Sequence, residues 1–186
     1  MSGRDLGRAV LTIARSAIAE RLGLPRGAET SHAALQEPSA TFVTLRHAGQ
    51  LRGCIGSLQA VRPLGEDVRQ NAIAAAFRDP RFAPLAATEF AATSVEVSLL
   101  SASEPIEVAS EEELLARLRP GVDGLILECG RHRATFLPQV WEALDEPREF
   151  LAALKHKAGL PEGFWSCSVN VSRYAVTKWV DQDFAF

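Results

Sequence analysis

The sequence predicts an α+β fold built on a mostly antiparallel sheet. Runs in which apolar and polar residues alternate, such as 94–100, predict strands, whereas apolar residues spaced three and four apart, as in 64–77, predict helices. A hairpin, a helix and a single long strand follow one another twice, in 41–100 and in 124–180. Because neither half has enough strands to close a sheet alone, we expect one shared, barrel-like sheet with helices packed on it.

The N-terminal half begins with an amphipathic helix, expected over residues 3–23 and closed by Gly23 and Pro25. The first hairpin turns at residues 48–50, where Gly49 can adopt a positive φ. Pro63 then opens a helix over about 64–77. The two prolines of the following 79–84 segment prevent that helix from continuing.

The second half repeats this order with little sequence identity. Ser110 and Glu113 form the pattern of a capping box for a short helix that ends near Gly121. Residues 124–138 predict a second hairpin, and Pro147 occupies the first position of another helix. The last strand is expected over about 169–180. No linker rich in Gly, Ser or Pro separates the halves, so we expect one domain over residues 1–186.

The composition excludes several classes of protein. The 186 residues carry a formal net charge of −3, which argues against a nucleic-acid or anionic-membrane binder. No apolar run approaches the roughly 20 residues that span a bilayer. The three cysteines are far apart and odd in number, which favours free thiols in a reducing compartment and hence a cytoplasmic protein.

The most informative stretch is residues 51–56, Leu-Arg-Gly-Cys-Ile-Gly. On a strand, Arg52, Cys54 and Gly56 share one face, so a guanidinium would lie beside the thiol and favour its anionic form. Gly53 and Gly56 indicate close approach by a ligand or by another backbone segment. The stretch therefore predicts either a reactive, accessible Cys54 or a small buried cysteine in a tightly packed strand.

Other residues extend this candidate site. Glu96 and Ser98 lie on the face of their predicted strand that points away from the core, and with Cys54 and Arg52 they form the candidate catalytic set. A cysteine nucleophile usually has a histidine base, but neither His47, His132 nor His156 has a sequence context that marks it as the partner of Cys54.

Arginines are the candidate substrate ligands, together with the glycines Gly53 and Gly56. Arg81 and Arg133 could converge with Arg52 on a carboxylate or phosphate. Alternatively, Arg81 bridges Asp79 and covers apolar surface with its stem. The sequence contains no metal-binding or nucleotide-binding motif, so no cofactor or metal is expected.

Five segments resemble the AMMECR-type domain, whose bacterial members are called AmmeMemoRadiSam system protein A. They are Phe-Val-Thr-Leu at 42–45, the 51–56 stretch, Asp-Pro-Arg-Phe at 79–82, Val-Ser-Leu-Leu at 97–100 and Arg-Ala-Thr-Phe-Leu-Pro-Gln-Val at 133–140. The resemblance covers nearly the whole chain. It implies an α+β fold with a barrel-like sheet and a genomic setting beside a Memo-like protein and a radical SAM enzyme. It supplies no established reaction. At one position the chain departs from the family pattern, because Glu96 stands where some relatives have an uncharged residue, and this counts against a catalytic role for Glu96.

Two functions remain open from the sequence. The first is a cytoplasmic enzyme or enzyme subunit that acts on a small anionic or carbonyl-bearing molecule in a cleft lined by Arg52 and Cys54. The second is a non-catalytic adaptor that docks on the Memo-like protein or the radical SAM enzyme through the glycine-flanked face. A nucleic-acid binder is less favoured because the chain lacks a basic face.

Overall fold

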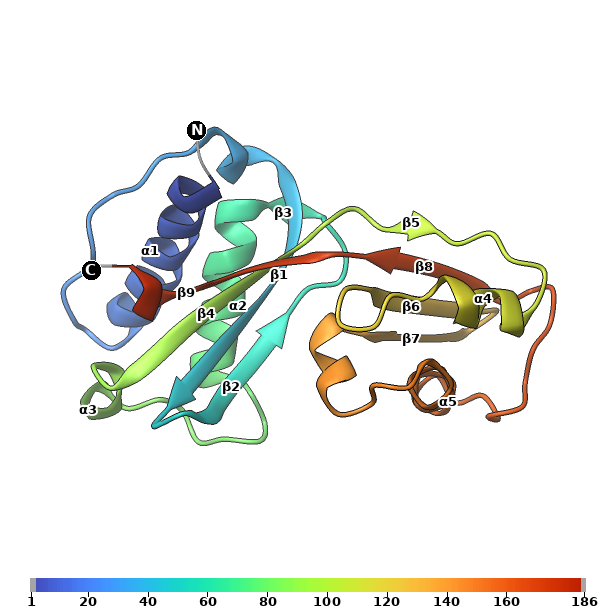
Figure 1. Ribbon diagram of the computed structural model, residues 1–186. Helices are drawn as coiled ribbons and strands as arrows, with labels where there is room; N and C mark the ends of the chain where they lie inside the picture. Colours follow the sequence, from blue (N-terminus) through green and yellow to red (C-terminus); the bar gives the residue numbers. More distant parts are fainter. Residues whose placement is uncertain (1–2, 185–186) are drawn as a thin grey trace. The chain divides into compact units, whose positions relative to one another are not determined.

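The computed structural model describes residues 3–184. The chain divides into two compact units, residues 1–100 with 177–186 and residues 101–176. Each unit has its own sheet and its own cluster of buried apolar side chains. Figure 1 shows how the elements of each unit follow one another along the chain.

The first unit combines a sheet with two long helices. Its elements are α1 (Gly3–Arg21), the 3-10 helix η1 (Ala33–Gln36), β1 (Pro38–His47), β2 (Gln50–Gly56), β3 (Arg62–Pro63), α2 (Leu64–Phe77), α3 (Ala87–Phe90), β4 (Thr93–Leu100), β9 (Val176–Val180) and the 3-10 helix η3 (Asp181–Asp183). The strand order is β2-β1-β4-β9, with the short β3 paired to the start of β1.

One face of this sheet is the core of the unit, and α1 and α2 cover it (Figure 1). Val43 and Leu45 of β1 and Val95 and Val97 of β4 are fully buried there, as alternation along the strands requires. The next residues along each strand point to the opposite face. That face carries the polar side chains of the candidate site.

The β1–β2 hairpin determines which of these polar side chains become neighbours. Ala48 and Gly49 connect the strands, and both have positive φ (50° and 77°), as a two-residue type I′ turn requires. The turn pairs His47 with Gln50, and a β-bulge that leaves Arg52 without a partner then shifts the register by one residue, so that Thr44 lies opposite Cys54. The β1–β4 register places Thr44 opposite Glu96. Thr44 is therefore flanked by Cys54 and Glu96.

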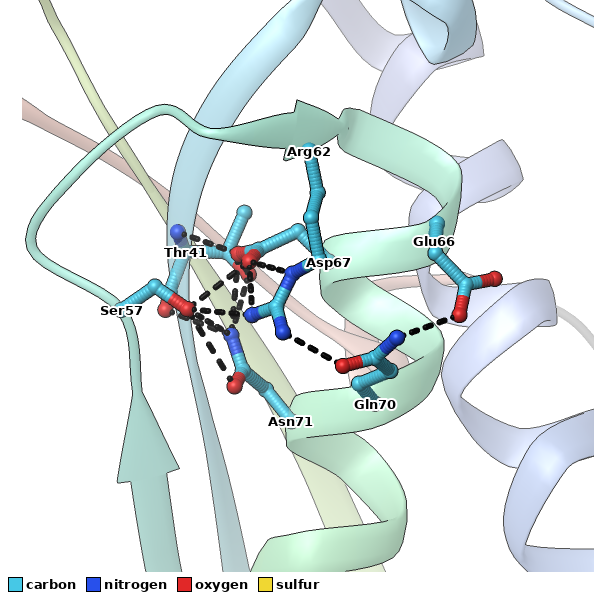
Figure 2. Close-up of polar contacts among 7 residues, drawn as sticks. All are labelled: Thr41, Ser57, Arg62, Glu66, Asp67, Gln70 and Asn71. Carbon is cyan, nitrogen blue, oxygen red and sulfur yellow. Dashed lines mark hydrogen bonds and ion pairs between the residues drawn. The ribbon is translucent and has the colours of Figure 1, made fainter.

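A buried polar cluster joins the N-terminal end of α2 to the sheet (Figure 2). The carboxylate of Asp67 is fully buried and accepts hydrogen bonds from the Thr41 backbone N–H at 2.9 Å, the Ser57 hydroxyl at 2.8 Å and Arg62 Nη2 at 2.6 Å. The Asn71 amide also donates to it at 2.9 Å. Because α2, β1 and the end of β2 all contribute, the cluster holds the helix in register with the hairpin.

The second unit is a smaller sheet with its own helices. It contains β5 (Glu104–Pro105), α4 (Glu111–Arg117), β6 (Gly124–Cys129), β7 (His132–Phe136), the 3-10 helix η2 (Pro138–Glu142), α5 (Pro147–Lys157) and β8 (Asn170–Tyr174), in the strand order β5-β8-β6-β7. Its core is built from Leu125, Leu127 and the apolar face of α5. Phe150 of α5 stacks on Trp141 at a centroid distance of 3.8 Å.

Most predicted elements are present. The α+β class and the antiparallel pairing are confirmed, and the helices expected over 3–23 and 64–77 are α1 and α2. Ser110 caps α4 by accepting the Glu113 backbone N–H, but the Glu113 carboxylate accepts the N–H of Ala109 instead of that of Ser110. The helix then ends at Arg117, earlier than expected.

The sheets differ from the expected single barrel. The strand predicted over 169–180 is interrupted at Ala175, so that β8 pairs within the second unit while β9 joins the sheet of the first. The expected last strand is therefore two strands, β8 and β9, and each belongs to a different sheet. Among residues 3–184, no helix combines the length and apolar character needed to cross a membrane.

Candidate functional site

A row of four polar side chains crosses the face of the first unit's sheet that α1 and α2 leave free. Cys54 lies on β2, Thr44 on β1, Glu96 on β4 and Lys178 on β9, so that each adjacent strand contributes one residue. The Thr44 hydroxyl donates a hydrogen bond to Cys54 Sγ at 3.3 Å. At the other end of the row, Lys178 Nζ lies 3.6 Å from Glu96 Oε2.

Exposure differs along this row. Thr44 and Glu96 are buried, whereas Cys54 is half-buried and about half of the Lys178 side chain is exposed. Cys54 and Lys178 are thus the more exposed ends of the row, and Thr44 and Glu96 lie between them. The row therefore joins a nucleophile, a hydrogen-bond donor, a carboxylate and a cation.

The two glycines that flank Cys54 serve packing. A Cβ on Gly53 would lie 2.1 Å from the carbonyl oxygen of Ala75, because the backbone of α2 passes directly over this position. A Cβ on Gly56 would lie 2.2 Å from the ring of Phe42, its neighbour on β1. Of the two alternatives that the sequence leaves open at Gly53, the structure shows close approach by another backbone segment.

The free edge of β2 is closed by the segment that follows α2. Cys54 faces this edge with its backbone groups, and its N–H donates to Asp79 Oδ2 at 2.9 Å. Its carbonyl oxygen accepts Arg81 Nη2 at 3.3 Å. Asp79 and Arg81 are joined by an ion pair of 2.7 Å, so together they supply the acceptor and the donor that a neighbouring strand would otherwise provide.

This pairing also determines the charge of Asp79. The hydrogen bond from the Arg81 guanidinium holds the pKa of the Asp79 carboxyl well below its usual range, and the backbone N–H groups of Cys54 and Arg81 act in the same direction. The buried carboxylate therefore stays ionised at neutral pH. Arg81 bridges Asp79, as the alternative sequence interpretation expects, and is also the guanidinium in contact with the Cys54 backbone.

Arg52 lies elsewhere than the sequence pattern suggests. Its Nε and Nη2 donate to the two carboxylate oxygens of Glu89 at 3.0 and 3.1 Å, and its Nη1 donates to the Ala83 carbonyl at 2.9 Å. The bidentate Arg52 guanidinium lowers the pKa of Glu89 to about 2. A paired carboxylate outcompetes a neutral thiol for a guanidinium, so Arg52 anchors α3 and its preceding loop to β2.

Both arginines approach the same aromatic ring. The guanidinium carbons of Arg52 and Arg81 lie 6.0 and 5.4 Å from the centroid of the Phe82 ring. The residues of the 79–82 segment thus form one ordered surface with β2. Arg133, the third predicted ligand, belongs to the second unit and pairs with Glu128 at 2.9 Å.

The remaining predicted residues are more simply placed. Ser98 is buried on the same face as Glu96, opposite Phe42 of β1.

Within residues 3–184 no histidine hydrogen-bonds Cys54. The ring of His132 instead bonds the Ala158 carbonyl at 2.9 Å, and His156 is exposed on α5. His47 lies at the end of β1, beside the turn. In this described part of the chain, no group of three or more His, Cys, Asp or Glu side chains could hold a metal ion.

Sequence reasoning did not identify Thr44, Lys178 and Glu89 as members of this region. Thr44 carried a usable signal, since the alternation of 41–45 puts it on the face away from Val43 and Leu45. Lys178 carried none, because the pairing of β9 with β4 joins residues far apart in sequence. The Arg52–Glu89 pair likewise depends on the tertiary path of the loop before α3.

Known proteins share these elements of the fold and of the candidate site. The AMMECR1 family model matches residues 11–179, which include the hairpin, the Asp79–Phe82 segment and both sheets. The chain belongs to the AMMECR1 family. A protein of Methanothermobacter thermautotrophicus is 40% identical over 183 residues, covering 92% of each chain. One of Thermofilum pendens is 40% identical and covers 86% of this chain and 81% of its own.

A solved structure shows the same AMMECR1 fold. The crystal structure of the uncharacterized protein PH0010 from Pyrococcus horikoshii is similar with a TM-score of 0.80 and 35% identity. The match covers 94% of this chain and 90% of that one. The family likeness seen in the five sequence segments is thereby confirmed for the chain.

Proposed function

We propose that this AMMECR1-family protein is a cytoplasmic enzyme, or the subunit of one, in which Cys54 attacks the carbonyl carbon of a small molecule. The observation that carries the proposal is the hydrogen bond of 3.3 Å from the Thr44 hydroxyl to Cys54 Sγ, in a row that continues to Glu96 and Lys178. Cys54 as a residue is half-buried.

The arrangement supports a carbonyl substrate better than an anionic one. Arg52, Arg81 and Arg133 are each paired with a carboxylate, Glu89, Asp79 and Glu128 respectively. The carboxylates therefore already neutralise the charges of these three guanidinium groups, which leaves them poorly suited to bind a phosphate or a carboxylate of a substrate. A carbonyl carbon needs only a nucleophile and a donor for its oxygen.

The proposed step balances without an oxidant. The S–H bond of Cys54 breaks and its proton passes to water, while the Thr44 hydroxyl keeps its hydrogen bond to Sγ. A bond forms between Sγ and the carbonyl carbon, and the electron pair of the C=O π bond moves to oxygen. The proton then returns to that oxygen, giving a hemithioacetal or hemithioketal.

The test uses acetaldehyde labelled with 13C at its carbonyl carbon, with the adduct followed by NMR. A saturable hemithioacetal signal should appear in wild type and in Cys167→Ser and vanish in Cys54→Ser. Cys167 is exposed and serves as the internal control thiol. Adduct formation at Cys54 no stronger than at Cys167 would remove the basis of the proposal.

A second candidate is the adaptor function, with a Memo-like protein or a radical SAM enzyme as the partner that the family resemblance implies. The surface formed by Arg52, Phe82 and Arg81 favours it, because arginine and aromatic side chains held in fixed positions are typical of interface hot spots. Co-purification with either partner that Phe82→Ala abolishes and Cys54→Ser leaves intact would support this function. Co-purification lost only in Cys54→Ser, or absent in wild type, would count against it.

A further inference from the structure

A cleft lies in the first unit between α1, α2 and the loop that joins α1 to η1. Its volume is about 360 Å³, which falls in the range of about 300–1,000 Å³ that is usual for small-molecule sites. Its lining includes Thr12, Ile13, Ser16, Arg26, Glu29 and Arg69. None of the four residues of the Cys54 row belongs to this lining.

Hydrogen bonds tie the loop to α1. The backbone N–H of Gly27 donates to the Ser16 hydroxyl at 3.1 Å, and the N–H of Leu24 donates to the Ala19 carbonyl at 2.9 Å. A Cβ on Gly27 would lie 3.2 Å from the Ser16 hydroxyl oxygen, so the loop passes close to the helix at this point. None of these contacts uses a charged side chain of the lining.

Two arginines of the lining share one carboxylate. Arg69 Nη2 donates to Glu20 Oε2 at 2.7 Å, and Arg26 Nη1 lies 3.4 Å from Glu20 Oε1. The hydrogen bond from Arg69, and then the charge of Arg26, lower the pKa of Glu20, so this carboxylate stays ionised at neutral pH. The other N–H groups of both guanidiniums have no partner among residues 3–184, and 63% of the Arg26 and 42% of the Arg69 side chain is exposed. One positive charge with accessible donors is therefore left over beside the cleft.

Glu29 places a negative charge in the same cleft. It is exposed and makes no ion pair or hydrogen bond within the described part of the chain, although Arg26 stands only three residues before it in the loop. A positive and a negative group thus border one space without pairing with each other. Such a space suits a ligand that carries both charges.

We infer that this cleft binds a free α-amino acid with an apolar side chain. The carboxylate of the amino acid accepts from the free N–H groups of Arg26 and Arg69, and its ammonium group donates to the Glu29 carboxylate. Its side chain packs against Ile13 and Ala28, which also line the cleft. A simple anion would meet the Glu29 carboxylate and a simple cation would meet the guanidinium groups, so both are disfavoured by like charge.

Three probes with one carbon skeleton test the inference. L-Leucine carries both charges, 4-methylpentanoate is leucine without its ammonium group, and 3-methylbutylamine is leucine without its carboxylate. In 1H–15N correlation spectra of the full chain, leucine should shift the amide signals of 12–16 and 26–30 saturably, with a dissociation constant on the order of 1 mM. The two singly charged probes should bind at least about tenfold more weakly.

Variants assign each charge of the ligand to its partner. Glu29→Gln should weaken leucine by about fivefold or more and leave 4-methylpentanoate no weaker than in wild type, and it should fold normally because the carboxylate has no partner to lose. Arg26→Gln should weaken both leucine and 4-methylpentanoate and spare 3-methylbutylamine. Glu37→Gln changes an exposed carboxylate outside the lining, so this matched control should bind all three probes as wild type does.

Three results would overturn the inference. The first is equal affinity of wild type for the three probes, and the second is the absence of saturable shifts at 12–16 and 26–30. The third is a Glu29→Gln variant that binds leucine as tightly as wild type does. Failure of the Cys54 adduct experiment leaves this inference standing, since the two sites share no residue.

Discussion

Asp79 accepts the backbone N–H of Cys54 at 2.9 Å, so a side chain completes the hydrogen bonding of an edge strand. The Arg81 guanidinium that is paired to Asp79 caps the adjacent carbonyl. The position of Cys54 is therefore held from one side by Asp79 and Arg81 and from the other by Thr44. These contacts explain the structural role of Asp79 and Arg81 in the Asp-Pro-Arg-Phe segment at 79–82.

Asp79→Ala should destabilise the protein by about 2–3 kcal/mol, because it leaves the half-buried Cys54 N–H without an acceptor and Arg81 without its ion-pair partner. Urea unfolding measures the free energy, and hydrogen exchange should show loss of protection at the Cys54 amide. Asp145→Ala, at an exposed position, should stay within about 0.5 kcal/mol of wild type. Unchanged protection of the Cys54 amide would contradict this account of the edge.

Gly53→Ala should destabilise by about 3 kcal/mol, because the new Cβ would meet the Ala75 carbonyl oxygen at 2.1 Å and push α2 from the sheet. Thermal and urea unfolding measure the change. Gly163→Ala is the matched control, since a Cβ there meets no atom within 4 Å. A stable Gly53→Ala variant that has lost only reactivity at Cys54 would instead assign this glycine to ligand access.

Stability should fall in acid in a way that depends on Glu89. The pKa of Glu89 is lowered by the Arg52 guanidinium to about 2 in the folded protein, below its ordinary value of 4.5. The contribution of the pair is thus fully present above about pH 4.5 and is lost as the pH falls toward 2.

Glu89→Gln tests this dependence. The urea midpoint of the variant should drop less between pH 6 and pH 3 than that of wild type, although the variant is less stable at pH 6. Glu112→Gln changes an exposed carboxylate on α4 and should keep the wild-type dependence. Identical pH dependence in wild type and Glu89→Gln would show that the Arg52 pair does not stabilise the fold.

Thr44→Val should slow alkylation of Cys54 by roughly threefold to tenfold, because valine has the shape of threonine but cannot donate a hydrogen bond to the sulfur. The rate is measured with iodoacetamide by mass spectrometry of the Cys54 peptide. The Cys167 peptide from the same digest should react at its wild-type rate. A variant in which both peptides keep their rates would remove Thr44 from the site.

Local patterns predicted most of the fold and part of the site. Apolar alternation located β1, β2 and β4, and it correctly placed Cys54, Glu96 and Ser98 on the face opposite α1 and α2. The same alternation could not show where a long side chain ends. Arg52 shares that strand with Cys54, yet its guanidinium is drawn to Glu89, 37 residues further along the chain.

Long-range pairing explains the other differences. The strand expected over 169–180 is continuous in its apolar pattern, but its interruption at Ala175 depends on which sheet each part joins. Lys178 enters the site through that pairing alone. The glycines of the 51–56 stretch signalled close approach correctly, whereas the identity of the approaching atom, the Ala75 carbonyl oxygen, is a property of the packed helix.

The reactivity of Cys54 relative to Cys167 within one chain tests the central claim most directly. Native protein is treated with limiting iodoacetamide near neutral pH, and the modified fraction of each cysteine peptide is measured over time. The account predicts that Cys54, although half-buried, is alkylated faster than the exposed Cys167. Alkylation of Cys54 more slowly than Cys167, or only after unfolding in urea, would contradict a reactive thiol at this site.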